Sequence, residues 1–245
     1  MKKTIMILCA VVGAYLPVAG ASSVLETDFT AYSGSTLPEG WNSGQWQGNN
    51  TPHFMLSAEK GAYVNYGWKQ NYLYTQVQLN SQMDAVITFT VWNNTTNTGN
   101  MFYLSSEQYS IIIGNSYTDY ANVYVGTDNA AVGSEFISFQ NGKIQTTLAY
   151  SENLSVVGNL NYTLTLNGGQ LDILVQNGES SWNYTLENIP DADFTTLGFI
   201  VDAAAGAASV KNVEMTLTPL IPEPTSSSLG ILALVTLLTR RRRSF

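Results

Sequence analysis

Two short stretches rich in aromatic and amide residues are the part of this chain best suited to binding a ligand. They are Trp41-Asn42-Ser43-Gly44-Gln45-Trp46-Gln47-Gly48-Asn49-Asn50 and Asn65-Tyr66-Gly67-Trp68-Lys69-Gln70-Asn71-Tyr72. Aromatic rings can pack on the apolar face of a pyranose, while amides hydrogen-bond to its hydroxyls. Trp41, Trp46, Trp68 and Tyr72 are therefore candidate ligand-binding residues. The same residue types are common in the strands and turns of β proteins, so a packing role stays open.

A second group of candidates consists of acidic residues close to expected loops. Calcium binds several oxygen ligands, mostly carboxylates and backbone carbonyls supplied by loops. Asp191, Asp193 and Asp202, together with the backbone of nearby glycines, could supply such ligands. Acidic loops also occur for solubility alone, so the sequence leaves calcium binding and simple solvation both open.

Residues for catalysis are less well represented. His53 is the only histidine, and nothing around it suggests the carboxylate and nucleophile that a Ser-His-Asp site requires. With one histidine and no cysteine outside the first 21 residues, we expect no zinc site. A glycosidase would need a pair of carboxylates. The sequence brings no such pair together locally, so we expect no catalytic residues.

The elements that must position these residues lie between two unusual ends. A basic start, the uncharged run Ile5–Leu16 and the small-residue site Ala19-Gly20-Ala21 predict a signal peptide over residues 1–21. A retained membrane anchor is the alternative, but this run is short of the ~20 apolar residues that a spanning helix needs. We therefore expect the protein to be exported across the inner membrane.

The C-terminal tail combines a proline motif, a short apolar run and a basic cluster. Pro222-Glu223-Pro224 precedes the uncharged stretch Ser226–Thr239, and four arginines follow it. A helix over this stretch would span roughly 21 Å, short of the ~30 Å hydrocarbon layer. Arginines favour the cytoplasmic side, so the rest of the chain is expected across the membrane from them. These features predict a transient membrane insertion.

The order and spacing of these three features resemble the PEP-CTERM sorting signal of exported bacterial proteins, over residues 220–245. In that family a membrane protease, exosortase, recognises and removes the tail and releases the protein towards the cell surface or extracellular matrix. The resemblance implies an exosortase-type protease as a partner. The implied recognition motif is Pro222, Glu223 and Pro224, and the implied cytoplasmic stop is Arg240, Arg241, Arg242 and Arg243. An ordinary tail-anchored protein is the alternative.

The segment between the two ends, residues 22–219, has the length of one domain. Four lysines against seventeen acidic residues give it a formal charge of −13. Such a charge repels nucleic acid and anionic lipid, so we expect no nucleic-acid partner. The only cysteine, Cys9, lies in the predicted signal peptide. The domain must therefore be stabilised by its core without a disulfide.

Apolar and polar residues in this segment alternate with the period of a β-strand. In Ala85–Trp92 the odd-numbered residues are apolar, and the threonines between them point to the other face. Leu160–Leu166 and Leu171–Val175 alternate in the same way, and Gly168-Gly169 between them can adopt the positive φ angles of a tight hairpin. Val213–Leu217 is a further alternating strand. Many such short strands predict an all-β sandwich or barrel.

These elements resemble a concanavalin A-like, laminin-G-type jelly roll over most of the segment. The resemblance depends on the strand Ala85–Trp92, the hairpin Leu160–Val175, and the loop Asp202–Gly206 that leads into Val210–Leu217. Gln176-Asn177-Gly178 lies where that family often has an Asn-Gly element after the late hairpin. The resemblance implies a single antiparallel β-sandwich, often with a calcium ion at its rim. A different all-β sandwich is the alternative.

The same family contains glycosidases with three acids along one strand in an E-x-D-x-x-E pattern. Glu26-Thr27-Asp28 begins this pattern, but no third acid follows. We therefore predict a non-catalytic protein of the cell surface or extracellular matrix, which binds glycans, polysaccharide or other matrix material, or has a structural role. A glycoside hydrolase or polysaccharide lyase, with carboxylates brought together from distant strands, is the alternative.

Overall fold

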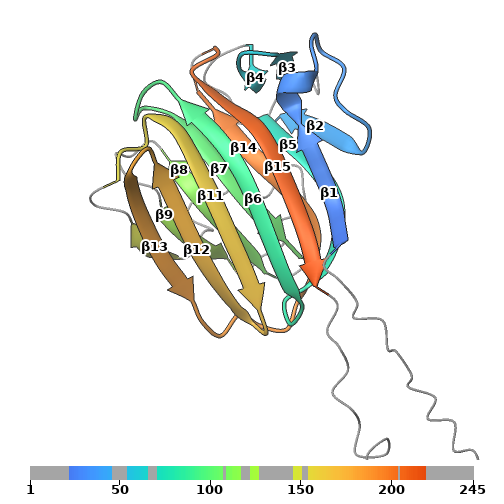
Figure 1. Cartoon of the computed structure of the whole chain (residues 1–245), viewed down its shortest axis with the longest axis vertical. Coiled ribbons are helices and arrows are strands. Elements are labelled where there is room, and N and C mark those ends of the chain that lie inside the picture. Colours follow the sequence, from blue (N-terminus) through green and yellow to red (C-terminus); the bar gives the residue numbers. More distant parts are fainter. Residues whose placement is uncertain are drawn as a thin grey trace, which may run out of the picture. The chain divides into compact units, whose positions relative to one another are not determined.

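The computed structural model describes residues 22–45, 54–65, 71–106, 109–116, 122–126, 146–150, 154–203 and 205–218. These residues form strands, apart from turns, loops and one 3₁₀ turn, η1 (Phe29–Ala31) (Figure 1). Within these ranges no helix has the length and hydropathy to cross a membrane. The predicted signal peptide and the segment that resembles a PEP-CTERM tail, for which transient membrane insertion is predicted, lie outside the described residues.

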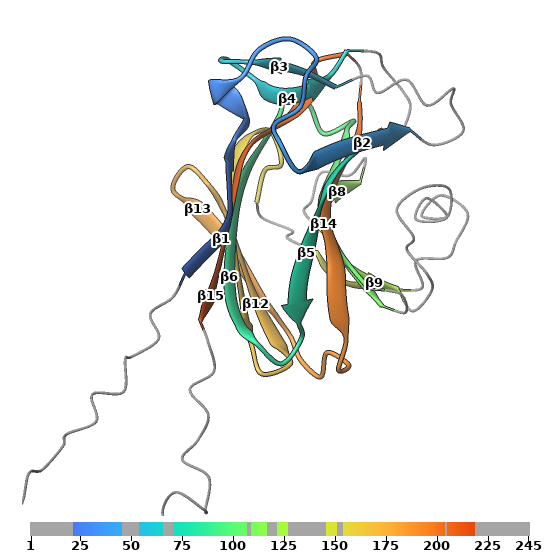
Figure 2. The same cartoon turned by 90° about the vertical axis from the view of Figure 1, so that its right-hand side faces the viewer.

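The described strands form two antiparallel sheets, which Figure 2 shows as two layers. The eight-stranded sheet has the order β13-β12-β11-β6-β15-β4-β3, and β1 pairs with the rest of the β15 edge that β4 occupies. Its strands are β1 (Ser22–Asp28), β3 (Phe54–Ser57), β4 (Gly61–Val64), β6 (Asp84–Asn93), β11 (Gly158–Asn167), β12 (Gln170–Asn177), β13 (Ser180–Leu186) and β15 (Ala208–Thr218).

The seven-stranded sheet has the order β10-β9-β8-β7-β14-β5-β2. Its strands are β2 (Trp41–Gln45), β5 (Asn71–Asn80), β7 (Gly99–Ser105), β8 (Ser110–Ser116), β9 (Asn122–Gly126), β10 (Thr146–Tyr150) and β14 (Asp193–Asp202). Neighbouring strands in both sheets run antiparallel. The predicted fold class, an antiparallel jelly-roll sandwich, is confirmed.

The strands with the clearest alternation lie where the sequence predicts them. Ala85–Trp92 lies within β6, and the predicted hairpin is β11 followed by β12. Its turn uses Gly168 at φ 55° and Gly169 at φ 88°, angles that glycine adopts without steric cost. Because the side-chain period of a strand is two, this register puts the alternating apolar residues of both strands on one face, and Leu174 of β12 is an apolar residue on the other face.

The core lies between the two sheets and is centred on a group of aromatic rings. Phe89 of β6 stacks on Phe102 of β7 and on Tyr162 of β11, with ring centroids 4.6 Å apart in both cases. Phe199 of β14 meets Phe89 edge-on at 5.4 Å. All four side chains are at most 2 % exposed. Burial of each contributes about 1.5–3 kcal/mol, which explains how the domain can be stable without a disulfide.

The two sheets differ in how their outer faces are exposed. In β6, the inward residues Ala85 to Val91 are buried, and the outward residues between them are half-buried or exposed. In β7 every residue is buried, so both faces of that strand are enclosed. The outer face of the eight-stranded sheet is therefore the broad surface on which described strands are open to solvent.

Candidate functional site

Trp41, the first of the aromatic candidates, is a core residue. Its side chain is 6 % exposed, and its indole Nε1 donates a hydrogen bond to Thr27 Oγ1 at 2.9 Å. The ring packs edge-on against Phe29 with centroids 4.9 Å apart and also stacks on Phe199. The packing role that the sequence left open is the role that Trp41 has, because no face of its ring is free for a sugar.

Tyr72 is also enclosed, at 1 % exposure, and lies in a polar cluster with Tyr103 and Asp202 on the outward side of the seven-stranded sheet. Burial raises the pKa of the Tyr72 phenol above its usual value, and the negative charge of Asp202 raises it further. Burial is the largest cause that raises the pKa of Tyr103 well above its usual value, and the nearby phenols of Tyr72 and Tyr74 raise it further. Both phenols therefore keep their protons at neutral pH. The other two aromatic candidates, Trp46 and Trp68, lie outside the described residues, as does His53.

The three calcium candidates do not lie together. Asp193 and Asp202 are the first and last residues of β14, so they sit about 30 Å apart at the usual rise of a strand. Asp191 and Asp193 do converge, because the Asn80 side-chain amide donates to Asp191 Oδ1 at 3.2 Å and to Asp193 Oδ1 at 2.7 Å. One ion cannot contact all three aspartates. The expectation of one shared calcium site is therefore wrong. It assumed that Asp193 and Asp202 lie in loops, whereas they are the two ends of the ten-residue strand β14.

The described residues offer no other cluster of metal ligands. Among them, no group of three or more His, Cys, Asp or Glu side chains is placed to hold a metal ion. The amide of Asn80 donates to both Asp191 and Asp193, so this pair is already held by a hydrogen-bond donor. Asp191 and Asp193 are therefore the remaining part of the predicted calcium set, without a third carboxylate beside them.

The acids that begin the glycosidase-like pattern have structural positions. Asp28 Oδ1 accepts hydrogen bonds from the Thr30 backbone N–H at 2.9 Å and from the Thr30 hydroxyl at 2.6 Å, which caps η1. Glu26 lies opposite Glu214 on the exposed face of the β1–β15 pair. Neither acid lies in a cleft with a second, buried carboxylate among the described residues. These two acids therefore do not form the catalytic pair that the glycosidase-like pattern would require.

The outer face of the eight-stranded sheet has a different chemistry from the core. Its outward positions are mostly hydroxyl and amide side chains. The row across β13, β12, β11, β6, β15 and β1 at the level of Thr90 consists of Ser181, Gln176, Asn161, Thr90, Asn212 and Asp28. The next row consists of Asn183, Leu174, Thr163, Thr88, Glu214 and Glu26. This face can therefore make many hydrogen bonds with a polar ligand.

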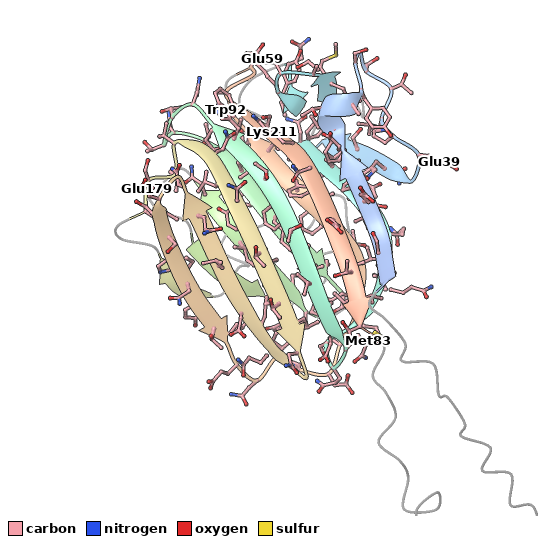
Figure 3. All side chains as sticks on the ribbon, viewed as in Figure 1. Glu39, Glu59, Met83, Trp92, Glu179 and Lys211 are labelled. Atoms are coloured by element: carbon pink, nitrogen blue, oxygen red, sulfur yellow. The ribbon has the colours of Figure 1, made fainter. Side chains whose placement is uncertain are left out.

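One tryptophan lies on this polar face. Trp92 follows Thr88 and Thr90 at the same parity of β6, so it points outward, and its side chain is half-buried. Asn159 of β11 lies directly opposite it in register. Figure 3 shows Trp92 and Lys211 at the same end of the eight-stranded sheet. We call Trp92, Thr90, Asn159 and Asn161 the Trp92 surface.

Two polar side chains of the Trp92 surface are hydrogen-bonded to each other. The Thr90 hydroxyl donates a hydrogen bond of 2.9 Å to Asn161 Oδ1. That bond orients the Asn161 side chain and leaves its two amide N–H groups as donors. An aromatic ring with amides and a hydroxyl beside it is the combination that a sugar ring with both apolar and polar surfaces requires. The surface is open and requires no rearrangement of β6 or β11.

Sequence analysis missed Trp92, although the signal was available. The alternation of Ala85–Trp92 assigns Thr88 and Thr90 to the outer face, and the same parity assigns Trp92 to that face. A tryptophan at an outward position of a strand is unusual because most large rings are buried. The stretches with a high content of aromatic and amide residues gave other candidates, and the described rings among them, Trp41 and Tyr72, lie in enclosed sites.

Two further features are less suited to sugar binding. Trp182 and Tyr184 of the edge strand β13 stack with centroids 6.1 Å apart, but they lie opposite the core residues Val175 and Ile173 and pack against the core. A groove of about 590 Å³ also opens between the sheets. Its described lining residues are Val24, Leu25, Gln76, Val77, Gln78, Thr195, Met215 and Leu217, and they include no aromatic ring.

Comparisons with known proteins place the fold among lectin-like sandwiches. The basic winged bean lectin solved with Tn-antigen superposes with a TM-score of 0.54 at 7 % identity, covering 82 % of this chain and 100 % of the lectin. The exoplasmic/lumenal domain of VIP36, in a form bound to Ca²⁺ and Man2, gives 0.52 at 9 % identity, covering 82 % and 89 %. The CBM2 module of the evolved Dit protein of Lactobacillus casei BL23 phage J-1 gives 0.51 at 13 % identity, covering 81 % and 97 %. At such identities the likeness concerns the fold alone.

No protein-family model and no curated protein matches the sequence. What the comparisons show is the fold, an antiparallel jelly-roll sandwich similar to those of legume lectins.

Proposed function

We propose that this chain is an exported, non-catalytic carbohydrate-binding module, and that it binds sugar on the Trp92 surface. The observation that supports this proposal is the half-buried, outward-facing Trp92 beside the amides of Asn159 and Asn161. A pyranose has an apolar face that can pack on the indole and equatorial hydroxyls that can bond with the amides. The lectin-like fold is consistent with this function but does not by itself locate the site.

Electrostatics favour the same class of ligand. The described strands next to the Trp92 surface include Asn212 on β15 and Gln176 on β12, which are neutral hydrogen-bonding residues. An uncharged sugar has no electrostatic repulsion to overcome when it binds here. Nucleic acid and anionic lipid, in contrast, are repelled by the charge of the whole domain. A carbohydrate ligand therefore agrees with both the local and the overall charge.

The test is binding of the purified domain to a panel of immobilised polysaccharides, with Trp92→Ala as the variant. We expect the variant to lose roughly tenfold or more in affinity, since burial of a large apolar side chain typically contributes about 1.5–3 kcal/mol. Trp182→Ala is the matched control, because it removes a half-buried tryptophan of the same sheet that packs on the core. Circular dichroism shows whether each variant is folded.

Two outcomes would contradict the proposal. The first is a folded Trp92→Ala variant that binds as tightly as the unchanged domain. The second is an unchanged domain that binds none of the polysaccharides on a panel covering glucose-, mannose-, galactose- and N-acetylglucosamine-based polymers. Loss of binding in Trp182→Ala alone would move the site to the β13 edge.

The proposal includes delivery to the cell surface or extracellular matrix. The support for it is the sequence alone, namely the predicted signal peptide 1–21 and the motif Pro222-Glu223-Pro224 with its arginine cluster. An exosortase-type protease would remove the tail after transient membrane insertion. Intact-mass measurement of the protein from its native host tests this, and a mature form that retains Arg240 to Arg243 contradicts it.

A further inference from the structure

The surface that adjoins Trp92 extends along two strands and is too long for a single sugar. Outward residues of β6 and β11 form two neighbouring columns, which we call the β6–β11 track. The track consists of Trp92, Thr90 and Thr88 on β6 and Asn159, Asn161, Thr163 and Thr165 on β11. We propose that the ligand of this protein is an extended, uncharged polysaccharide chain that lies along this track. The inference rests on the proposed carbohydrate-binding function.

The length of the track carries the first part of the inference. Asn159 and Thr165 are six residues apart on one strand, which is about 20 Å at the usual rise. Over this length each outward position of β11 is a hydroxyl or an amide, and each has a polar residue or Trp92 opposite it on β6, up to the pair Thr165–Val86. A monosaccharide on Trp92 would leave most of these groups unused, whereas a chain of several sugars can bond with them in succession.

The shape of the track carries the second part. Its side chains are exposed or half-buried, and they project from two strands paired in continuous register from Gly158–Asn93 to Leu166–Ala85. The track therefore has no end wall formed by its own strands, and a polymer can enter and leave along the strand direction. Pockets that select a terminal sugar are concave instead, because they must surround one unit.

The charges beside the track carry the third part. Asp172 of β12 lies opposite Thr165, and Glu214 of β15 lies opposite Thr88. Both acids are exposed on the same face. Lys211 lies at the Trp92 end of the same sheet, but the two acids and the overall charge of the domain together repel polymers of uronic acids or sulfated sugars. A chain of uncharged sugars meets no such repulsion and finds a dense set of donors and acceptors.

Binding measurements with sugars of different length test the inference. Isothermal titration calorimetry of the domain with disaccharides and hexasaccharides of β-1,4-linked glucose, mannose and N-acetylglucosamine, and with hexagalacturonate, separates length from charge. We expect a neutral hexasaccharide to bind roughly tenfold or more tightly than its disaccharide, since each added hydrogen bond typically contributes up to a tenfold gain. We expect hexagalacturonate to bind more weakly than any neutral hexasaccharide that binds.

Variants in the part of the track beyond the Trp92 surface make the test specific. The double variant Thr88→Val, Thr163→Val removes two hydroxyls that pair across β6 and β11 while keeping their β-branched shape. We expect it to weaken hexasaccharide binding roughly three- to tenfold and to leave disaccharide binding unchanged. Ser181→Ala, on the exposed edge strand β13, is the control that should change neither.

The results separate the inference from the function on which it rests. If disaccharide and hexasaccharide bind equally and Trp92→Ala abolishes both, the module binds sugar but the extended track is wrong. If hexagalacturonate is the tightest ligand, the uncharged class is wrong. If no sugar binds to the unchanged domain, both the function and the track are overturned. Length-dependent binding that the Thr88→Val, Thr163→Val double variant reduces supports the whole inference.

Discussion

At the residue scale, Tyr162 shows how the core makes stability depend on pH. Its ring is 2 % exposed and stacks on Phe89, and burial raises the pKa of its phenol above the usual value near 10. The unfolded chain loses this proton above pH 10, whereas the folded protein retains it. The stabilisation is therefore complete below pH 10 and is lost as the pH rises above that value.

We predict that Tyr162→Phe makes the free energy of unfolding less dependent on pH between 10 and 12. Each tyrosine that stays protonated only when folded contributes a slope of about 1.4 kcal/mol per pH unit. The variant should lose one such contribution and keep those of Tyr72, Tyr103 and Tyr109, whose pKa values burial also raises. Urea unfolding at several pH values measures the slope. Tyr32→Phe, at a side chain 43 % exposed, is the control, and an equal slope in all three proteins would contradict the prediction.

At the element scale, the close approach of β7 and β14 depends on one glycine. The ring of Tyr103 crosses β14 at Gly198, where a Cβ would lie 2.7 Å from its Cζ and hydroxyl oxygen, and 2.6 Å from the Leu73 carbonyl oxygen. The carbonyl belongs to the neighbouring strand β5 and cannot move without breaking the sheet. Any side chain here must therefore displace both a strand and a ring.

We predict that Gly198→Ala destabilises the domain by about 1–3 kcal/mol or more, the usual effect of overpacking a filled site. Gly44→Ala is the matched control, because its Cβ would lie 3.8 Å from Tyr72 Cδ2, an ordinary contact distance. Gly44→Ala should lower the free energy of unfolding by less than about 0.5 kcal/mol, because alanine also restricts the unfolded chain and so offsets part of any loss. Thermal and chemical denaturation compare the two. Similar stabilities for both variants would show that the region around Gly198 can relax.

The same scale shows which elements could be predicted from the sequence. The strands β6, β11 and β12 each have one buried face, so their apolar residues alternate and the pattern reveals them. Most of β14 is buried on both faces, so Leu197 to Val201 is a continuous apolar run without a period of two. For that reason the strand was not recognised, and Asp193 and Asp202 were expected in loops that could share one calcium ion.

Candidate site residues were harder to predict than strands for a related reason. Composition identifies where aromatic and amide residues gather, but the side chain's direction depends on the register of the sheet. Trp41 faces the core because of its pairing with Thr75 on β5, and nothing within the five residues of β2 reveals that pairing. Trp92, in contrast, lies in a long alternating strand whose parity alone gives its direction.

At the scale of the whole molecule, the two layers divide the tasks of the domain. The inward faces of both sheets supply the apolar contacts, and the seven-stranded sheet also encloses polar groups such as Asp202 on its outer side. The eight-stranded sheet keeps one face open to solvent. A sandwich of this kind can therefore present one broad polar face without exposing its core.

The register in which β6 pairs with β11 determines both which residues form the core and which residues form the outer face. Both strands have a period of two, so moving one past the other by a single residue would turn Thr163 and Asn161 inward and bring Tyr162 and Leu164 to the solvent. Such a slip would expose the core as well as remove the proposed sugar-binding groups. If the proposed function holds, ligand preference can evolve by exchanging outward side chains one at a time, but not by sliding the strands.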